Sequence, residues 1–182
     1  MSNSFPYRFN LKSGTVASIR EARAADAKAL IDYLDNVSGE TNFLTFGAGE
    51  FDLGEAEEAA FLEMCHTDEG QLYLVAVAEN RIVATLHFAA GRRARVRHSG
   101  EFGMSVSRGY WGEGIGSALI DALVAWAKQT FFVKKINLRV RENNERARHL
   151  YEFKGFKPEG TLTNEMYVDG KYYDLVAMGL SL

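Results

Sequence analysis

Cysteine, proline and long apolar runs are scarce in this chain, and each scarcity excludes a class of protein. A single cysteine, Cys65, excludes an intrachain disulfide framework and fits a reducing compartment. Two prolines and no low-complexity tract argue against a linker between domains. Residues 1–14 hold no apolar run of signal-peptide length, and no stretch approaches ~18 consecutive apolar residues. We therefore expect a cytoplasmic protein without a membrane partner.

An excess of positive charge is also missing. The formal net charge of -3 leaves no basic surface for nucleic acid, so no nucleic-acid partner is expected. His66, His87 and His149 show no metal-ligand spacing with one another or with Cys65, and we expect no metal. The 182 residues, 47% hydrophobic and 25% charged, suit one globular domain over residues 1–182, with residues 1–13 as a loosely held N-terminal arm.

Hydrophobic periodicity predicts a mixture of strands and helices. Strands are expected at residues 15–20, 71–78, 81–90, 98–106, 135–140, 156–167 and 171–180. Helices are expected at residues 24–37, 55–66, 114–131 and 144–154. Glu79-Asn80 and Asp169-Gly170 separate adjacent strands, and Asp-Gly is a strong hairpin signal. Four arginines within residues 91–97 fit a solvated turn, or alternatively a contact for an acidic ligand.

A glycine-rich loop over residues 109–116 is the most informative local feature. It follows a strand-like run and opens into an apolar-periodic helix. The first amides of a helix are unpaired and carry the positive end of its dipole, so such a loop binds phosphate or pyrophosphate. The P-loop lysine is missing after Gly114, and the glycine spacing does not fit a dinucleotide fingerprint. A nucleotide-binding interpretation is therefore disfavoured.

Two motifs, in order and about 30 residues apart, resemble the GNAT N-acetyltransferase superfamily. Trp111-Gly112-Glu113-Gly114-Ile115-Gly116 is similar to its acetyl-CoA loop, Gln/Arg-x-x-Gly-x-Gly/Ala, except that Trp111 replaces the first residue. The second motif resembles Asn-x-x-Ala-x-x-Leu-Tyr-x-x-x-Gly-Phe. Its matching residues are Asn144, Ala147, Leu150, Tyr151, Gly155 and Phe156. The resemblance covers roughly residues 15–180.

The resemblance implies an α/β (α+β) fold: a mixed, mostly antiparallel sheet, splayed between its fourth and fifth strands and flanked by about four helices. It also implies that an acetyl group moves from acetyl-CoA, a co-substrate, to a primary amine of a small molecule, amino acid or peptide by direct attack in a ternary complex. The alternative is a non-catalytic acyl-CoA-binding sensor or interaction module. Edge strands near the C-terminus suggest a homodimer without establishing it.

The resemblance also places the cofactor-binding residues. Unpaired amides of the loop and helix start would hold the pyrophosphate, and a strand edge would pair with pantetheine and polarise the thioester carbonyl. The loop positions are Gly112, Glu113, Gly114, Ile115, Gly116 and Ser117, and the edge is Met104, Ser105 and Val106. Trp111 would stack on the cofactor or simply pack. Asn144 would meet the pantetheine or cap a helix.

Catalysis needs an acid for the thiolate and a base for the amine. Tyr151 occupies the family's general-acid position, and its phenol is protonated at neutral pH. At pH 7 the pH is about 3.4 units below the pKa of a lysine-like amine, so the amine is protonated. Removing that proton costs about 4.6 kcal/mol, part of which a base offsets. Glu101 is the leading base and His98 the second; a solvent-facing carboxylate and a surface histidine are the structural alternatives.

The acceptor site is expected between residues 36–54 and 164–172. Acidic and aromatic residues there suit a cationic amine, although surface charge and packing explain them equally well. These residues are Glu40, Glu50, Asp52, Glu165 and Asp169, with Phe43, Phe46, Tyr167, Tyr172 and Tyr173.

Overall fold

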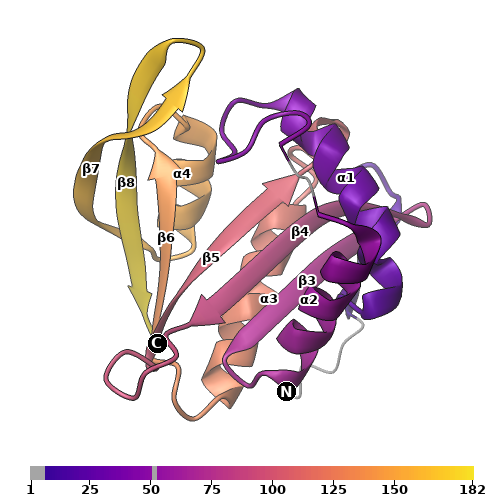
Figure 1. Ribbon diagram of the computed structural model, residues 1–182, viewed down its shortest axis with the longest axis horizontal. Coiled ribbons are helices and arrows are strands. Elements are labelled where there is room, and N and C mark those ends of the chain that lie inside the picture. Colours follow the sequence, from indigo (N-terminus) through magenta and orange to yellow (C-terminus); the bar gives the residue numbers. More distant parts are fainter. Residues whose placement is uncertain (1–6, 51–52) are drawn as a thin grey trace.

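One mixed sheet forms the centre of the protein in a computed structural model that describes residues 7–50 and 53–182 (Figure 1). Within those ranges the sheet has eight strands in the order β1-β2-β3-β4-β5-β6-β8-β7. The strands are β1 Tyr7–Asn10, β2 Val16–Glu21, β3 Gln71–Ala78, β4 Arg81–Ala90, β5 Ser99–Val106, β6 Lys135–Arg141, β7 Lys157–Val168 and β8 Lys171–Ser181. The α-helices are α1 Ala27–Glu40, α2 Glu55–Thr67, α3 Ile115–Gln129 and α4 Glu145–Phe153.

The sheet opens between β5 and β6, as predicted for the fourth and fifth expected strands. All other neighbouring strands are antiparallel, whereas β5 and β6 are parallel. Their pairing covers only Ser99–Glu101 against Lys135–Asn137. Beyond Glu101 and Asn137 the facing edges have no strand partner, so backbone groups in the middle of the sheet stay available.

Helices cover both faces of the sheet because each strand alternates its side chains between them. On one face, α1 and α2 pack Leu30 and Leu62 against Val75 of β3. On the other, α3 packs Leu119 and Leu123 into the larger core. In Figure 1, α1 and α2 lie in front of the sheet and α3 passes behind it.

Both predicted hairpins form with left-handed turn residues. Glu79 and Asn80 have φ of 50° and 59°, and Asp169 and Gly170 have φ of 50° and 78°. Two successive residues with positive φ form a two-residue turn whose twist matches that of the flanking strands. The observed bounds of β3 and β4 are those predicted, and α1 begins three residues late because residues 24–26 form a 3-10 turn.

The prediction of a loose arm over residues 1–13 is wrong for its described part. Tyr7–Asn10 pair antiparallel with β2, and Leu11 is buried at the turn between the two strands. Residues 7–11 alternate apolar and polar side chains, which is a strand signal that the prediction did not use, and the edge of β2 supplies the backbone partners. Among the described residues no helix is both long and apolar enough to cross a membrane.

Candidate active site

The glycine loop has the geometry of an anion cradle. Gly112 and Gly114 have φ of 83° and 91°, which side chains rarely adopt, and Gly114 caps the start of α3. Ala118 is the first residue of the helix whose amide donates to a backbone carbonyl, that of Gly114 at 3.0 Å. The amides of residues 112–117 thus have no backbone acceptor within the described chain. These are the six amides that the sequence assigned to pyrophosphate.

Trp111 has a role in the structure that the sequence did not predict. Its indole Nε1 donates a hydrogen bond of 2.7 Å to the carbonyl of Val106, at the end of the open β5 edge. Two guanidinium groups lie over its ring, that of Arg146 at 4.8 Å and that of Arg108 at 5.6 Å from a ring centroid. The Arg146 guanidinium also lies beside Gly112. Positive charge therefore reaches the loop without the Gln or Arg that Trp111 replaces.

Gly116 brings three elements of the site together. A Cβ built on it would lie 3.1 Å from Leu150 of α4 and 3.4 Å from the methyl carbon of Met104 on β5. The missing side chain lets the start of α3 approach both, so the cradle, the open strand edge and α4 meet at this glycine. Met104 and Ser105 are half-buried on that edge.

Tyr151 of α4 points into the larger core. It is 7% exposed and makes edge contacts with Phe102 and Phe156, at 5.9 and 6.0 Å between ring centroids. Burial raises the pKa of Tyr151 to about 12. The phenol therefore stays protonated at neutral pH, and its hydroxyl has no hydrogen-bond partner among the described residues. A buried hydroxyl normally has a partner, so this donor is available to a ligand.

Asn144 caps α4, which was one of its two predicted roles. Its Oδ1 accepts from the amide of Ala147 at 3.2 Å. Asn144 and Tyr151 are seven residues, about two helical turns, apart and so lie on one face of α4. The cap orients the helix that carries Tyr151, and the side-chain amide nitrogen of Asn144 remains available.

Glu101 lies where β5 and β6 part, whereas His98 does not. Glu101 pairs in register with Asn137, the last pair before the opening, and its carboxylate lies 3.4 Å from Nε of Arg139. Arg139 also lies 3.7 Å from Glu165. His98 precedes β5 and is exposed at the opposite end of that strand from the glycine loop. The geometry thus separates the two base candidates.

An open space adjoins Glu101, and a histidine that sequence reasoning left unassigned lies beside it. A Cβ built on Gly103 would meet no heavy atom within 4 Å. His87 of β4 is the register partner of Gly103, so both project to the same face. Its Nε2 lies 3.1 Å from Oε1 of Gln71, and burial lowers its pKa. A neutral imidazole therefore borders the space. The sequence carries no motif for it, because the pairing of β4 with β5 creates the proximity.

The predicted acidic wall is already used within the protein. Glu40 accepts from the amide of Arg108 at 2.6 Å, and Glu50 accepts from the amide of Gly47 at 2.7 Å. Glu165 pairs with Arg139, and Asp169 accepts from the side chain of Asn42 at 3.0 Å. Asp52 lies outside the described residues. These acids hold the loops of the site together.

The predicted aromatic wall is likewise occupied. The guanidinium of Arg141 lies 4.3 Å from the ring centroid of Phe43 and 4.1 Å from that of Tyr173. Tyr167 and Tyr172 contact each other at the exposed tip of the last hairpin. A protein cation thus already lies over Phe43 and Tyr173, which favours the packing alternative for these two rings.

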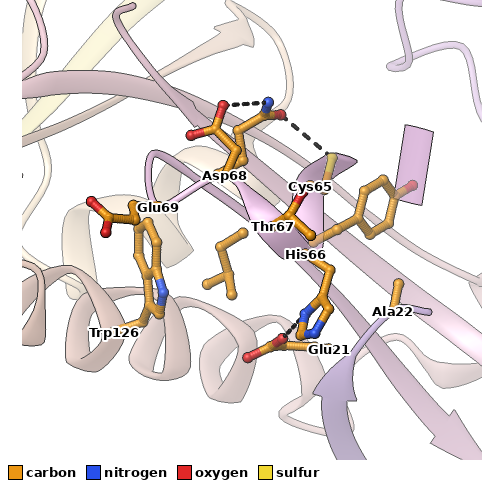
Figure 2. Close-up of a pocket in the computed structure, with 11 residues that line it drawn as sticks. Glu21, Ala22, Cys65, His66, Thr67, Asp68, Glu69 and Trp126 are labelled. Atoms are coloured by element: carbon orange, nitrogen blue, oxygen red, sulfur yellow. Dashed lines mark hydrogen bonds and ion pairs between the residues drawn. The ribbon is translucent and has the colours of Figure 1, made fainter. Parts of the chain in front are cut away.

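A separate hollow of about 150 Å³ lies between α2, the start of β3 and Trp126 of α3 (Figure 2). In it, Nδ1 of His66 lies 2.9 Å from Glu21, and Gln71 links Asp68 to the thiol of Cys65. Burial raises the pKa of Cys65 to about 12, so it remains a thiol at neutral pH. Strand β4 separates this hollow from the opening between β5 and β6. Among the described residues no group of three metal-ligating side chains occurs.

Comparisons with known proteins agree with this geometry. A crystal structure of a GNAT-family acetyltransferase from Streptococcus pneumoniae is 31% identical, with a TM-score of 0.88 over 91% of this chain and 99% of that one. Spermidine N(1)-acetyltransferase of Vibrio cholerae is 23% identical over 80% of this chain and 84% of its own length. The fold is also that of yncA from Salmonella typhimurium, solved with its cofactor acetyl-CoA, at a TM-score of 0.79 and 19% identity over 91% and 94% of the two chains.

The model of the acetyltransferase (GNAT) family matches residues 32–156, which include the glycine loop, β6 and α4. The chain therefore belongs to the GNAT family and is an acetyltransferase that takes its acetyl group from acetyl-CoA.

Proposed function

We propose that the opening between β5 and β6 is the catalytic site, in which a primary amine of a small molecule, amino acid or peptide attacks acetyl-CoA directly. The observation that carries the proposal is the meeting of three features at Gly116: six unpaired amides, an unpaired strand edge, and the helix bearing Tyr151. The amides of residues 112–117 hold the pyrophosphate. Arg146, beside Gly112, contributes positive charge to the same loop.

In this proposal the β5 edge over Met104–Val106 binds pantetheine. The amide of Val106 donates to the thioester carbonyl and stabilises the oxyanion that forms on attack. Trp111 holds the neighbouring Val106 carbonyl and so fixes the orientation of that peptide group. The amine nitrogen bonds to the carbonyl carbon, and the carbon–sulfur bond then breaks to release the thiolate of coenzyme A.

Proton movement is assigned to Glu101 and Tyr151. Glu101 accepts a proton from the ammonium, directly or through water, and Arg139 keeps the carboxylate at the opening. Tyr151 donates a hydrogen bond to the departing thiolate. A phenol with a pKa near 12 is about 3.5 units weaker as an acid than a thiol of pKa ~8.5, so hydrogen bonding rather than full transfer is its main contribution. The nitrogen loses two protons in all: the one that Glu101 accepts is released to solvent, and the one lost after attack ends on the thiolate of coenzyme A.

Calorimetric titration of the purified chain with acetyl-CoA, with ATP and NAD as controls, tests the cofactor assignment. Selective binding of acetyl-CoA, followed by release of free thiol on addition of an amine, is the expected result. Binding without thiol release across an amine panel would instead favour the non-catalytic sensor. Binding of ATP or NAD in its place would remove the support for the pyrophosphate cradle.

We also propose that two copies associate through the C-terminal edge of the sheet. Strand β7 is the last strand in the order and pairs only with β8, so its outer edge has free backbone groups. Exposed Leu162 and Tyr167 lie on the same strand. Sedimentation velocity of the full chain and of a Leu162→Lys variant tests this: a dimer that the variant dissociates is expected, and a monomeric wild type would contradict it.

A further inference from the structure

We propose that the acceptor amine also carries a carboxylate, and that Arg141 binds that carboxylate. The inference rests on the proposed function, because it places the acceptor at the same opening between β5 and β6. It specifies what the sequence and the relatives leave open: an amino-acid-like acceptor rather than a purely cationic amine.

Arg141 is a buried cation without a negatively charged partner. Its side chain belongs to a residue only 8% exposed, and no carboxylate in the described chain forms an ion pair with it. Nε donates to Oδ1 of Asn143 and Nη1 to the carbonyl of Asn42, both at 2.8 Å. Nη2 has no hydrogen-bond partner among the described residues, and it remains accessible to solvent. A buried charge is costly unless it is paired, so an incoming anion is favoured here.

The surroundings of Arg141 leave it pre-oriented. Its guanidinium contacts the rings of Phe43 and Tyr173, while the two hydrogen bonds fix its plane. A planar guanidinium held in one orientation forms strong, directional hydrogen bonds to a carboxylate. The side-chain entropy that such binding usually costs has already been lost on folding.

The position of Arg141 relative to Glu101 fits an acceptor with an amine at one end and a carboxylate at the other. On β6 the buried Leu138 and Val140 face the α3 core, so Arg139 and Arg141 face the α1 side. Glu101 is in register with Asn137, four residues before Arg141, which is about 13 Å along the strand. The long side chains shorten that span from both ends. Gly103, two residues after Glu101 on the same face of β5, has no heavy atom within 4 Å of the position of a Cβ, so the face beside Glu101 is open.

The charges along this face oppose a purely cationic acceptor. Arg139 is paired with Glu101 and Glu165, which leaves Arg141 as the cation without a counter-ion. A polyamine would bring a second positive charge towards it. The named relative from Vibrio cholerae acts on spermidine, so the inference predicts a difference between this chain and that relative.

The test uses matched acceptors with the wild-type protein and saturating acetyl-CoA. Thiol release is measured for common amino acids, for the carboxamide of each, and for spermidine. We expect kcat/KM to fall about 10- to 100-fold when the carboxylate becomes a carboxamide, because a hydrogen-bonded charge pair is lost. The carboxamide has the lower amine pKa and hence more neutral amine, so that effect opposes the expected loss and cannot cause it.

The variant Arg141→Gln tests the residue, with Arg97→Gln as a matched control. Arg97 also lies over an aromatic ring, that of Phe132, but precedes β5 at the far end of the strand. We expect Arg141→Gln to bring the acid-to-carboxamide ratio of kcat/KM within threefold of one while the KM for acetyl-CoA stays unchanged. Arg97→Gln should keep the wild-type ratio. A purely structural role would lower the melting temperature and all rates together without moving the ratio.

Equal turnover of amino acids and carboxamides by the wild type, or spermidine as the best acceptor, would overturn the inference and leave the proposed function intact. An unchanged ratio in Arg141→Gln would overturn the role of Arg141. If that variant does not fold, Arg141→Lys is used instead, together with the wild-type ratio, because lysine keeps the charge but not the planar fork. We expect Arg141→Lys to have a lower acid-to-carboxamide ratio of kcat/KM than the wild type. Absence of thiol release with every amine would overturn the proposed function itself.

Discussion

Replacing Tyr151 by phenylalanine removes one oxygen atom from the proposed site and leaves the ring packing intact. The ring contacts Phe102 and Phe156, and the hydroxyl has no partner among the described residues. Folding therefore loses no hydrogen bond, and we expect the melting temperature to change little or to rise slightly. The cradle at residues 112–117 is untouched, so the affinity for acetyl-CoA should also stay the same.

The expected loss is in the chemical step. A hydrogen bond to a charged group contributes about 1.5–3 kcal/mol, which corresponds to about 10- to 150-fold in rate. The upper part of the range for general acid catalysis is not expected, because a phenol of pKa near 12 is too weak an acid to protonate a thiolate fully. The same pKa implies that Tyr151 produces no alkaline limb in the pH–rate profile below about pH 10.

Single-turnover measurement of thiol release, with enzyme in excess over acetyl-CoA, separates this step from product release. Titration calorimetry with acetyl-CoA and a thermal melt on the same preparation are the controls. A rate within threefold of wild type, with binding and melting temperature unchanged, would refute the assignment of Tyr151 to the leaving thiolate.

Three further predictions concern the loop and the neighbouring histidine. Gly114→Ala should destabilise the fold by about 1–2 kcal/mol, because φ of 91° is strained for a residue with a Cβ, and should weaken acetyl-CoA binding; a denaturant titration and calorimetry measure the two effects. Arg146→Ala should raise the Kd for acetyl-CoA about two- to fivefold at low salt and less at high salt, as expected for an exposed charge; equal losses at both salt concentrations would contradict this. Because burial lowers the pKa of His87, the neutral His87 stabilises the fold above pH ~6.5, and this stabilisation is lost as the pH falls through the lowered pKa. In His87→Gln the free energy of unfolding should therefore change less with pH over that window, as measured by urea titration at about pH 5 to 8.

Local features of the site were predictable because each depends on residues close together in the chain. The glycine loop, the unpaired amides at the start of α3, and the shared helix face of Asn144 and Tyr151 follow from residue type and spacing, whereas the positive φ of Gly112 and Gly114 is seen only in the structure. The order of strands and helices from β2 onwards and the opening between β5 and β6 followed from periodicity together with the family resemblance, and both are confirmed, whereas strand β1 was not predicted.

Residues close together in the chain were thus enough to identify the family, the glycine loop and the helix that carries Tyr151. The charges at the proposed acceptor site depend on tertiary contacts, because ion pairs and ring contacts join residues far apart in the chain. Arg141 reaches Asn42 across 99 residues, and Asn42 reaches Asp169 across 127. Residue type alone suggested acids and aromatic rings awaiting a cationic amine. Folding placed Arg141 on those rings and used those acids elsewhere, which is why we propose an acceptor that carries a carboxylate.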